Sequence, residues 1–324
     1  MSSLDARHVA HNALPIIDIS GLRSSDPAAR EAVGKALHSA CRDKGFFYIS
    51  HHGIDPVLQQ RVFEEAQHFF ALPDSEKRKV DKAQSNANRG YEPLGNQTLE
   101  ANAPPDLKEG YYIGPDLPLD APEVLAGKFN FGPNQWPERA AFKSAMLDYS
   151  AAVTELSELL MEGLALSLNL PADYFDEFCR DANPILRLLH YPPQPANPQP
   201  NEKGCGAHTD WGGVTLLLQD DNPGLQVWDQ ETQAWLHADP IPGTYVVNLG
   251  DMIARWTNDL YRSTLHRVVN ISGRERFSVP FFYSGNPNHE VRCLPVCLAE
   301  GESPRYAPVT VEQHMIDMYR TTYA

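Results

Sequence analysis

The chain has 324 residues, with 27 Lys and Arg against 42 Asp and Glu, which gives a formal net charge of −15 at pH 7. A field of this sign repels phosphate backbones and anionic lipid surfaces, so neither nucleic acid nor a membrane is an expected partner. Five unpaired cysteines without CxxC spacing, a first segment (1–14) without an apolar signal core, and the lack of any apolar run of roughly 20 residues predict a cytoplasmic protein.

The first part of the chain is predicted to be mainly helical, with one or two strands. A β-type run at 15–20 is followed by Asp26-Pro27, an N-cap with proline at the first helical position, and we expect this helix to end at Gly45. The run "FFYISHHG" predicts a second strand. Apolar residues at helical spacing in 56–72 predict a second helix and make His68 a surface or packing residue.

Residues 83–136 are rich in Gly, Pro and Asn and carry no sustained period, so we expect an irregular but ordered covering. Trp136-Pro137 opens the longest expected helix, which runs to about Leu170 and stops before Pro171. We therefore divide the chain into an N-terminal helical and irregular region, 1–136, packed on a second region, 137–324, that contains this supporting helix and the core.

From Pro184 onward, seven short β-rich runs alternate with turn residues, from "ILRLLHY" to "RFSVPFFYS". This pattern is typical of an antiparallel sandwich or barrel. The proline-rich stretch "YPPQPANPQPNEKG" predicts a lid or connection between two runs. The expected fold class is therefore α+β with a mainly β core, at about 184–290.

Two His-x-Asp pairs, His208-Thr-Asp210 and His237-Ala-Asp239, are candidate metal ligands. On a strand, residues i and i+2 share one face about 6.6 Å apart, so such a pair can bind one ion and leave most of its coordination sphere open. The second pair precedes Pro240 in a turn-like stretch, where Asp side chains usually bond local backbone. The first lies between glycines ahead of an apolar strand. Taken alone, either pair is more often structural.

Residues further along the chain favour a metal-binding role for His208 and Asp210. "STLHRVVN" places His266 in a β-run, and the turn-like "ISGRE" separates it from "RFSVPFF". If the two runs form a hairpin of even register, His266, Arg276 and Ser278 project from one face of adjacent strands. The guanidinium and hydroxyl can then hold a carboxylate, while two imidazoles and one carboxylate suit ferrous iron and leave three positions open.

Jointly, these motifs resemble the non-haem iron(II) and 2-oxoglutarate-dependent oxygenases, in particular the isopenicillin N synthase-like family. The matching stretches cover nearly the whole chain: "PIIDIS", "KGFFYISHHGI", "ALPDSEKRK", "HYPP", "AHTD", "VVNLGD" as a turn between barrel strands, "LHRV" and "RFSVPFF". The resemblance implies a double-stranded β-helix barrel, of the jelly-roll or cupin-like type, that holds Fe(II) on His208, Asp210 and His266.

The same resemblance implies how the co-substrates bind. The keto-acid end of 2-oxoglutarate would chelate the iron, and its distal carboxylate would meet Arg276 and Ser278, with the Tyr191 hydroxyl as a further donor. Dioxygen would be the second co-substrate, succinate and carbon dioxide would be released, and ascorbate is a candidate reductant. No catalytic residue beyond the metal ligands is expected.

Two alternatives stay open. Isopenicillin N synthase and aminocyclopropane carboxylate oxidase share the Arg-x-Ser pair without using 2-oxoglutarate, so an iron oxidase of the same fold is one. A non-catalytic metal-binding barrel is the other, although a structural site normally adds a fourth protein ligand. The chain also departs from the plant-type Asn-Tyr-Tyr-Pro-Pro, because Leu189-His190 precedes Tyr191.

The segment "RGYEPLGNQTLE" resembles the bacterial and fungal branch that includes thymine hydroxylase, which implies a small polar substrate. Candidate substrate contacts are Arg89, Tyr91 and Glu109, each with a surface or packing role as the competing interpretation. The sequence leaves the oligomeric state and the oxidised position open.

Overall fold

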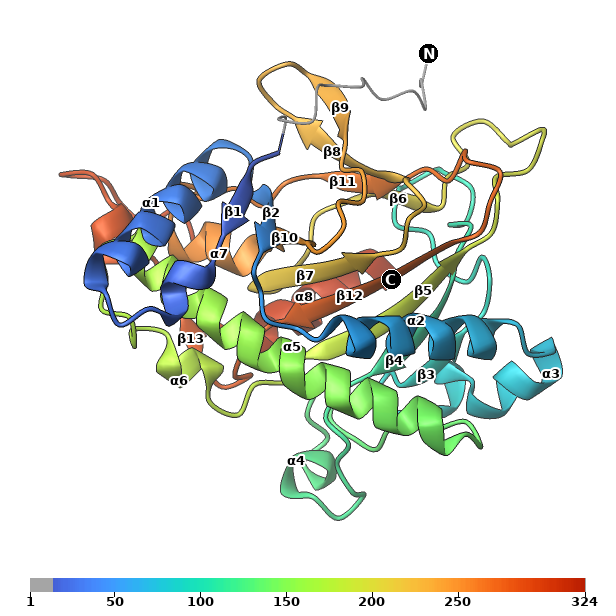
Figure 1. Cartoon of the computed structure of the whole chain (residues 1–324). Coiled ribbons are helices and arrows are strands. Elements are labelled where there is room, and N and C mark those ends of the chain that lie inside the picture. Colours follow the sequence, from blue (N-terminus) through green and yellow to red (C-terminus); the bar gives the residue numbers. More distant parts are fainter. Residues whose placement is uncertain (1–13, 324) are drawn as a thin grey trace.

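Two mainly antiparallel sheets form the centre of the molecule (Figure 1), whose computed structural model describes residues 14–323. The stretch 1–13, on which the expected lack of a signal core rests, lies outside the described residues. The larger sheet has eight strands, in the spatial order β1 (Ile16–Asp18), β2 (Phe46–Ser50), β10 (Tyr245–Leu249), β7 (Val214–Gln219), β12 (Arg276–Tyr283), β5 (Ile185–Tyr191), β4 (Glu109–Ile113) and β3 (Gly90–Glu92). Among the strand pairs of this sheet that the structure describes, β1–β2 is parallel and the others are antiparallel.

The smaller sheet has four strands, in the order β6 (Cys205–His208), β11 (His266–Val268), β8 (Leu225–Asp229) and β9 (Ala234–His237). Apolar side chains from both sheets form one buried cluster, including Tyr191 from the larger sheet and Val268 from the smaller. The two sheets therefore face each other across a shared interior, as a double-stranded β-helix requires. A further ribbon pairs β13 (Glu290–Val291) with β14 (Val309–Thr310).

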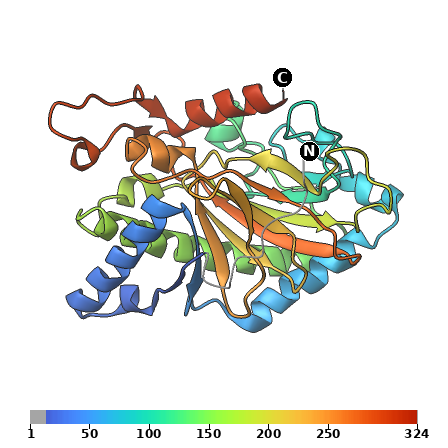
Figure 2. The ribbon, with the colours of Figure 1, turned by 90° about the horizontal axis from the view of Figure 1, so that it is seen from above.

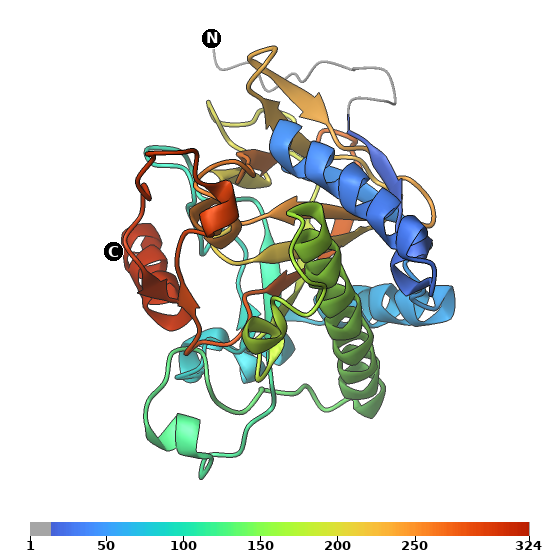
Figure 3. The same cartoon turned by 90° about the vertical axis from the view of Figure 1, so that its left-hand side faces the viewer.

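Helices cover the outer face of the larger sheet. The long helix α5 (Ala140–Ser167) packs against both α1 (Pro27–Asp43) and α2 (Pro56–Phe70), and its apolar stripe contacts β7 and β12. The shorter helices are α3 (Asp74–Lys77), α4 (Pro122–Leu125), α6 (Asp176–Cys179) and α7 (Asp251–Trp256). Helix α8 (Val311–Tyr323) lies on the other side of the sheets from α1 and α2 (Figures 2 and 3).

The predicted helix starts are confirmed by their caps. The carboxylate of Asp26 accepts a hydrogen bond from the Ala28 N–H at 3.0 Å, and that of Asp55 accepts one from the Val57 N–H at 2.9 Å, each with proline at the first helical position. After α1 the chain turns through Gly45 at φ 65°, where a Cβ would come within 2.1 Å of the Arg262 carbonyl oxygen. The glycine predicted there is therefore required by both its φ and its neighbour.

Three predictions about the elements need correction. Residues 83–136 are not wholly irregular, because β3 and β4 complete one edge of the larger sheet. Strand β10 leads into helix α7 rather than into a turn between strands. The runs that contain His266 and Arg276 do not form a hairpin, since β11 belongs to the smaller sheet and β12 to the larger. Residues 269–275 instead cross from one sheet to the other.

Within residues 14–323, no helix combines the length and the apolar character that crossing a bilayer would require. All five cysteines are free thiols.

Candidate active site

One cluster of potential metal ligands lies in the space between the two sheets. His208 is the last residue of β6, Asp210 follows two positions later, and His266 opens β11. In the antiparallel β6–β11 pair, His266 lies directly opposite His208. One ligand atom from each of the three residues lies within 4.8 Å of the others, and the part of the chain that the structure describes contains no second group of this kind.

Backbone contacts fix the orientation of both imidazoles. The Nδ1 of His208 is 2.8 Å from the Gly206 carbonyl oxygen, and the Nδ1 of His266 is 3.1 Å from the Thr264 carbonyl oxygen. Because a carbonyl only accepts, Nδ1 carries the proton and Nε2 keeps its lone pair. Burial lowers the pKa of both rings, that of His266 to about 4, so both imidazoles are neutral at pH 7 and able to bind a metal.

The carboxylate of Asp210 is held from the opposite sheet. Its Oδ2 accepts hydrogen bonds from Thr215 Oγ1 at 2.6 Å and Asn248 Nδ2 at 2.7 Å. Its Oδ1 lies 3.8 Å from the His208 Nε2 and 3.7 Å from the His266 Nε2. Burial opposes ionisation of Asp210, but the two imidazoles and the two hydrogen bonds outweigh it and lower its pKa.

These distances and donors fit a bound Fe(II). Separations of 3.7 and 3.8 Å are too long for hydrogen bonds, yet two metal–ligand bonds of about 2 Å each can span them. Two neutral imidazoles and one carboxylate on one side of an ion are the donor set of non-haem Fe(II) oxygenases, and they leave positions open for co-substrates. The pair His237 and Asp239 lies at the end of β9, with 3.9 Å between Nδ1 and Oδ1, and within residues 14–323 no third potential ligand joins it.

A narrow cavity of about 70 Å³ extends from the metal ligands to Arg276, Ser278 and Tyr191. Arg276 is 0% exposed; its Nη2 donates to Gln219 Oε1 at 2.8 Å, but its Nε and Nη1 find no partner within residues 14–323. Tyr191 pairs with Arg276 in the β5–β12 register, with its ring 5.1 Å from the guanidinium. A buried guanidinium with two unsatisfied nitrogens calls for an anionic acceptor, so the distal carboxylate of 2-oxoglutarate fits here.

The sequence did not point to three further residues at this site. Thr215 and Asn248 orient Asp210, and Lys108 lines the narrow cavity with its Nζ 2.5 Å from Asp106 and 3.2 Å from the Cys205 sulfur. Asn248 could have been recognised in the sequence, because its polar side chain interrupts the apolar run of β10. Lys108 could not, since it lies in a segment without hydrophobic periodicity.

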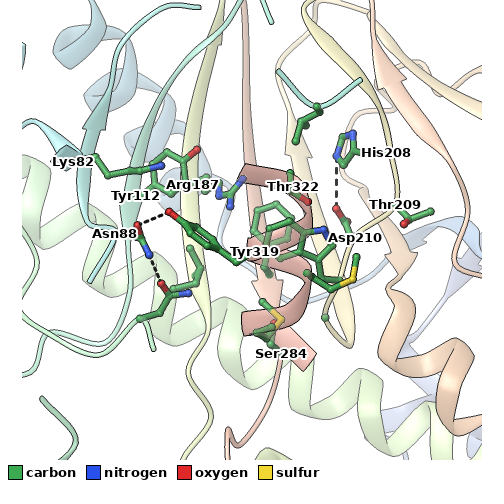
Figure 4. A pocket seen from close by; sticks show the side chains of 18 of the residues that line it. Lys82, Asn88, Tyr112, Arg187, His208, Thr209, Asp210, Ser284, Tyr319 and Thr322 are labelled. Atoms are coloured by element: carbon green, nitrogen blue, oxygen red, sulfur yellow. Dashed lines mark hydrogen bonds and ion pairs between the residues drawn. The ribbon is translucent and has the colours of Figure 1, made fainter. Parts of the chain in front are cut away.

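A second cavity, of about 240 Å³, opens beside the metal ligands (Figure 4). Its wall combines residues from 82–130, from the sheets and from α8; the α8 residues are Met315, Met318, Tyr319 and Thr322. Helix α8 is fastened by His314, whose Nε2 donates to the Trp211 carbonyl oxygen at 2.9 Å. Of the three candidate substrate contacts, Arg89 lines this cavity, whereas Tyr91 and Glu109 do not.

Tyr91 and Glu109 instead belong to a buried ionic network. Glu109 accepts hydrogen bonds from the Tyr91 hydroxyl at 2.6 Å, from the Lys77 Nζ at 2.7 Å and from the His190 Nδ1 at 2.7 Å. His190, which departs from the plant-type motif, therefore has a partner of its own. Its three donors come from α3, β3 and β5, so the Glu109 carboxylate on β4 links these four elements.

Comparisons with known proteins agree with this geometry. Residues 182–285 match the 2OG-Fe(II) oxygenase superfamily, and residues 14–139 match the family described as non-haem dioxygenase in morphine synthesis N-terminal. The 2-oxoglutarate-Fe(II) type oxidoreductase hxnY of Emericella nidulans is 44% identical over 320 residues, covering 97% of this chain and 92% of that protein. The 2-oxoglutarate-dependent dioxygenase citB of Monascus ruber is 40% identical over 320 residues, covering 96% and 95%.

Among solved structures, a full-length Neurospora crassa protein crystallised with alpha-KG superposes with a TM-score of 0.84 at 31% identity, covering 99% of this chain and 100% of that one. A second structure of the same protein holds alpha-KG and thymine, again with a TM-score of 0.84 and 31% identity, covering 97% and 99%. The chain belongs to the non-haem Fe(II)- and 2-oxoglutarate-dependent oxygenases.

Proposed function

We propose that this oxygenase holds Fe(II) on His208, Asp210 and His266 and binds 2-oxoglutarate in the narrow cavity that ends at Arg276. The observation that carries the proposal is the buried Arg276 guanidinium, whose Nε and Nη1 have no partner within residues 14–323 although the cavity connects them to the metal ligands. Ser278 and Tyr191 add hydroxyl donors to the same end. The substrate is a small molecule that enters the cavity beneath α8 and is oxidised there.

The chain's own residues prepare this reaction. Hydrogen bonds to backbone carbonyls hold both imidazoles with Nε2 toward the metal position, and Thr215 and Asn248 turn Asp210 toward the same point. Arg276 neutralises the distal carboxylate of 2-oxoglutarate, and the buried walls keep bulk water away from the reacting groups. The iron, when bound, supplies the centre at which 2-oxoglutarate and dioxygen react to generate the oxidant.

A comparison of two arginines tests the co-substrate assignment. Arg276 is fully buried, whereas Arg274, two residues earlier, pairs with the exposed Asp221 at 3.5 Å. We expect Arg276→Leu to weaken 2-oxoglutarate binding by at least about 10-fold, because one charge-assisted hydrogen bond contributes about 1.5–3 kcal/mol, and Arg274→Leu to leave it unchanged. Binding is measured anaerobically on the Fe(II)-loaded protein, and succinate formation is then measured in air.

Three outcomes contradict the proposal. Equal 2-oxoglutarate affinity in both arginine variants removes Arg276 from the co-substrate site. Oxygen consumption that needs a substrate but forms no succinate identifies an oxidase of the same fold. Tight zinc or nickel retention without any oxygen consumption identifies a non-catalytic metal-binding barrel.

A cytoplasmic location is part of the same proposal. The net charge of −15 and the five free thiols support it. Cell fractionation with an antibody against the native chain tests it, and recovery of the protein in the oxidising extracellular fraction would contradict it.

A further inference from the structure

The wall of the larger cavity has an unusual charge for this chain. Its lining includes three cations, Lys82, Arg89 and Arg187, and one carboxylate, that of the metal ligand Asp210. The whole chain carries a formal charge of −15, so this local excess of positive charge opposes the overall charge. A cavity with such walls concentrates anions, because its low-dielectric surroundings screen charges weakly.

A carboxylate just outside the lining, that of Glu92, offsets one of these positive charges. The Lys82 Nζ lies 2.5 Å from Glu92 and 4.3 Å from the centre of the Tyr112 ring. Glu92 also accepts a hydrogen bond from the Tyr112 hydroxyl. Arg187 also acts on Glu92 and helps to lower the pKa of its carboxyl. Lys82, Arg187 and Glu92 together therefore keep one net positive charge, and Arg89 adds a second.

Arg187 is held rigidly at the junction of the two cavities. It pairs with Tyr112 in the β4–β5 register, and its guanidinium carbon lies 4.4 Å from the Tyr112 ring centre and 4.8 Å from that of Phe282. Figure 4 shows the guanidinium between Tyr112 and the side of the pocket that carries His208 and Asp210. Arg187 lines both cavities. Stacking against two rings fixes the charge before a ligand arrives, which lowers the entropic cost of binding.

Arg89 is buried without a carboxylate among its hydrogen-bond partners. It is 1% exposed, and it donates to the carbonyl oxygens of Ala87 at 2.7 Å and Asn130 at 2.6 Å. Its Nε has no partner in the described chain. Burial lowers its pKa to about 10, so it stays charged at neutral pH. A buried cation bonded only to neutral groups favours an anion in the adjoining space.

Aromatic side chains form much of the remaining wall. Tyr112, Trp211, Phe282 and Tyr319 all line the cavity, together with Met315 and Met318. Flat rings pack well against such surfaces, and thioethers adapt to them. The volume of about 240 Å³ lies below the roughly 300–1,000 Å³ typical of drug-sized ligands, so one ring with short substituents fits best.

From these observations we propose that the substrate is a small aromatic carboxylate whose negative group pairs with Arg187, with Arg89 adding to the positive potential. The ring lies among the aromatic and methionine side chains of the wall. This inference rests on the proposed function, because it takes the larger cavity as the substrate site. The proposed substrate is anionic and flat, which is a narrower class than the small polar molecule expected from the sequence.

The test compares acids with their own amides. Full-length protein is loaded with Zn(II) and 2-oxoglutarate, which fills the co-substrate site without turnover, and is titrated calorimetrically with benzoate, 2-hydroxybenzoate and phenylacetate. Each is compared with benzamide, 2-hydroxybenzamide or phenylacetamide. We expect at least one acid to bind at least 10-fold more tightly than its amide, and Arg187→Met to abolish that preference by weakening the acid more than the amide.

Arg255→Met is the matched control. Arg255 also stacks on an aromatic ring, that of Tyr306 at 4.9 Å, but it lines a different hollow, and its replacement should leave the preference intact. The inference is overturned if no acid binds more tightly than its amide, or if Arg187→Met retains the preference. In either case, 2-oxoglutarate binding by the unsubstituted protein leaves the proposed function standing, whereas its absence in that protein counts against the proposed function itself.

Discussion

Two buried carboxylates, Asp210 and Glu109, have neighbouring imidazoles but opposite roles. Glu109 accepts three hydrogen bonds of 2.6 to 2.7 Å, from a lysine, a tyrosine and a histidine. Asp210 accepts two short bonds on Oδ2, while its Oδ1 faces two imidazole nitrogens at 3.7 and 3.8 Å. The partners of the first carboxylate all come from the protein, whereas the second has one oxygen without a close donor, which suits the metal position that we propose.

The histidines show the same contrast. His208 and His266 bond backbone carbonyls through Nδ1 and turn Nε2 toward Asp210. His190 uses its Nδ1 for Glu109 itself. Buried acids and histidines occur together around both carboxylates, so their presence alone does not identify a metal site. Two observations distinguish them: the distance between the imidazole nitrogen and the carboxylate oxygen, and whether that nitrogen is Nδ1 or Nε2.

The largest effect is expected at Asp210. Asp210→Ala removes the only anionic ligand, so Fe(II) affinity should fall by more than the roughly 10- to 100-fold that loss of a supporting hydrogen bond causes, and succinate formation should stop. Metal content after equilibrium dialysis measures this. Asp239→Ala, in the other His-x-Asp pair, is the control and should bind iron normally; equal iron content in the two variants would rule out the triad.

The next effect concerns stability at Glu109. Glu109→Gln leaves the buried Lys77 without its counter-charge, and we expect a loss of about 3–5 kcal/mol in the free energy of unfolding, measured by urea denaturation. The double variant Lys77→Met with Glu109→Gln should recover part of that loss. A single variant as stable as the parent chain would show that the network contributes nothing.

A smaller effect on Fe(II) affinity is expected when a hydrogen bond to Asp210 is removed. Asn248→Ala removes one of the two donors to Oδ2, so Fe(II) affinity should fall by about 10- to 100-fold while the three ligands remain. Thr215→Val removes the other donor and should act in the same range. Competition with a colorimetric chelator measures both affinities, and unchanged values would mean that Asp210 needs no orientation from the larger sheet.

The pH dependence of the metal-free protein should separate the two carboxylate regions. Burial and the neighbouring His208 hold the pKa of His266 at about 4, below its ordinary 6.5, so its contribution to stability is present above 6.5 and is lost as the pH falls toward 4. Burial raises the pKa of Glu109, but bonds from His190, Lys77 and Tyr91 outweigh it, so this contribution persists until the pH falls below 4.5.

Urea midpoints between pH 7 and pH 3 check this order. His266→Gln should flatten the curve between 6.5 and 4, and Glu109→Gln should flatten it only below 4.5. Identical profiles for the parent chain and His266→Gln would contradict the assignment.

The smallest effect is expected at Asp239, which is about half exposed and lies 3.9 Å from His237. Asp239→Ala should change the free energy of unfolding by no more than about 0.5 kcal/mol. Thermal denaturation measures this, and a larger loss would show a structural role that the pair's geometry does not indicate.

Local patterns in the sequence located much of this molecule. The Asp26-Pro27 cap predicted α1, apolar residues at helical spacing predicted α2, and glycine context together with His266 singled out the three residues that the structure brings together. Arg276 and Ser278 were expected beside His266 because of a hairpin, whereas they line one cavity with His208, Asp210 and His266 because two facing sheets share one interior. Either topology places them there, so a mistaken strand pairing still selected the same residues.

Long-range pairing explains what could not be predicted. Glu109 finds its partners 32 residues earlier at Lys77 and 81 residues later at His190, and no local pattern connects them. Strand β4 is buried along its whole length, so it lacks the alternation that identifies a strand in a sequence. Tyr91 and Glu109 therefore resembled loop residues available to a substrate.

Helix α8 adds four side chains to the wall of the larger cavity and none to the metal cluster or to the narrow cavity. It also lies beyond both segments that match the family, 14–139 and 182–285. If the larger cavity is the substrate site that we propose, part of the substrate selectivity is encoded outside the iron and 2-oxoglutarate sites. Exchanging this one short helix between relatives offers a direct route to engineer the choice of molecule while leaving the iron chemistry in place.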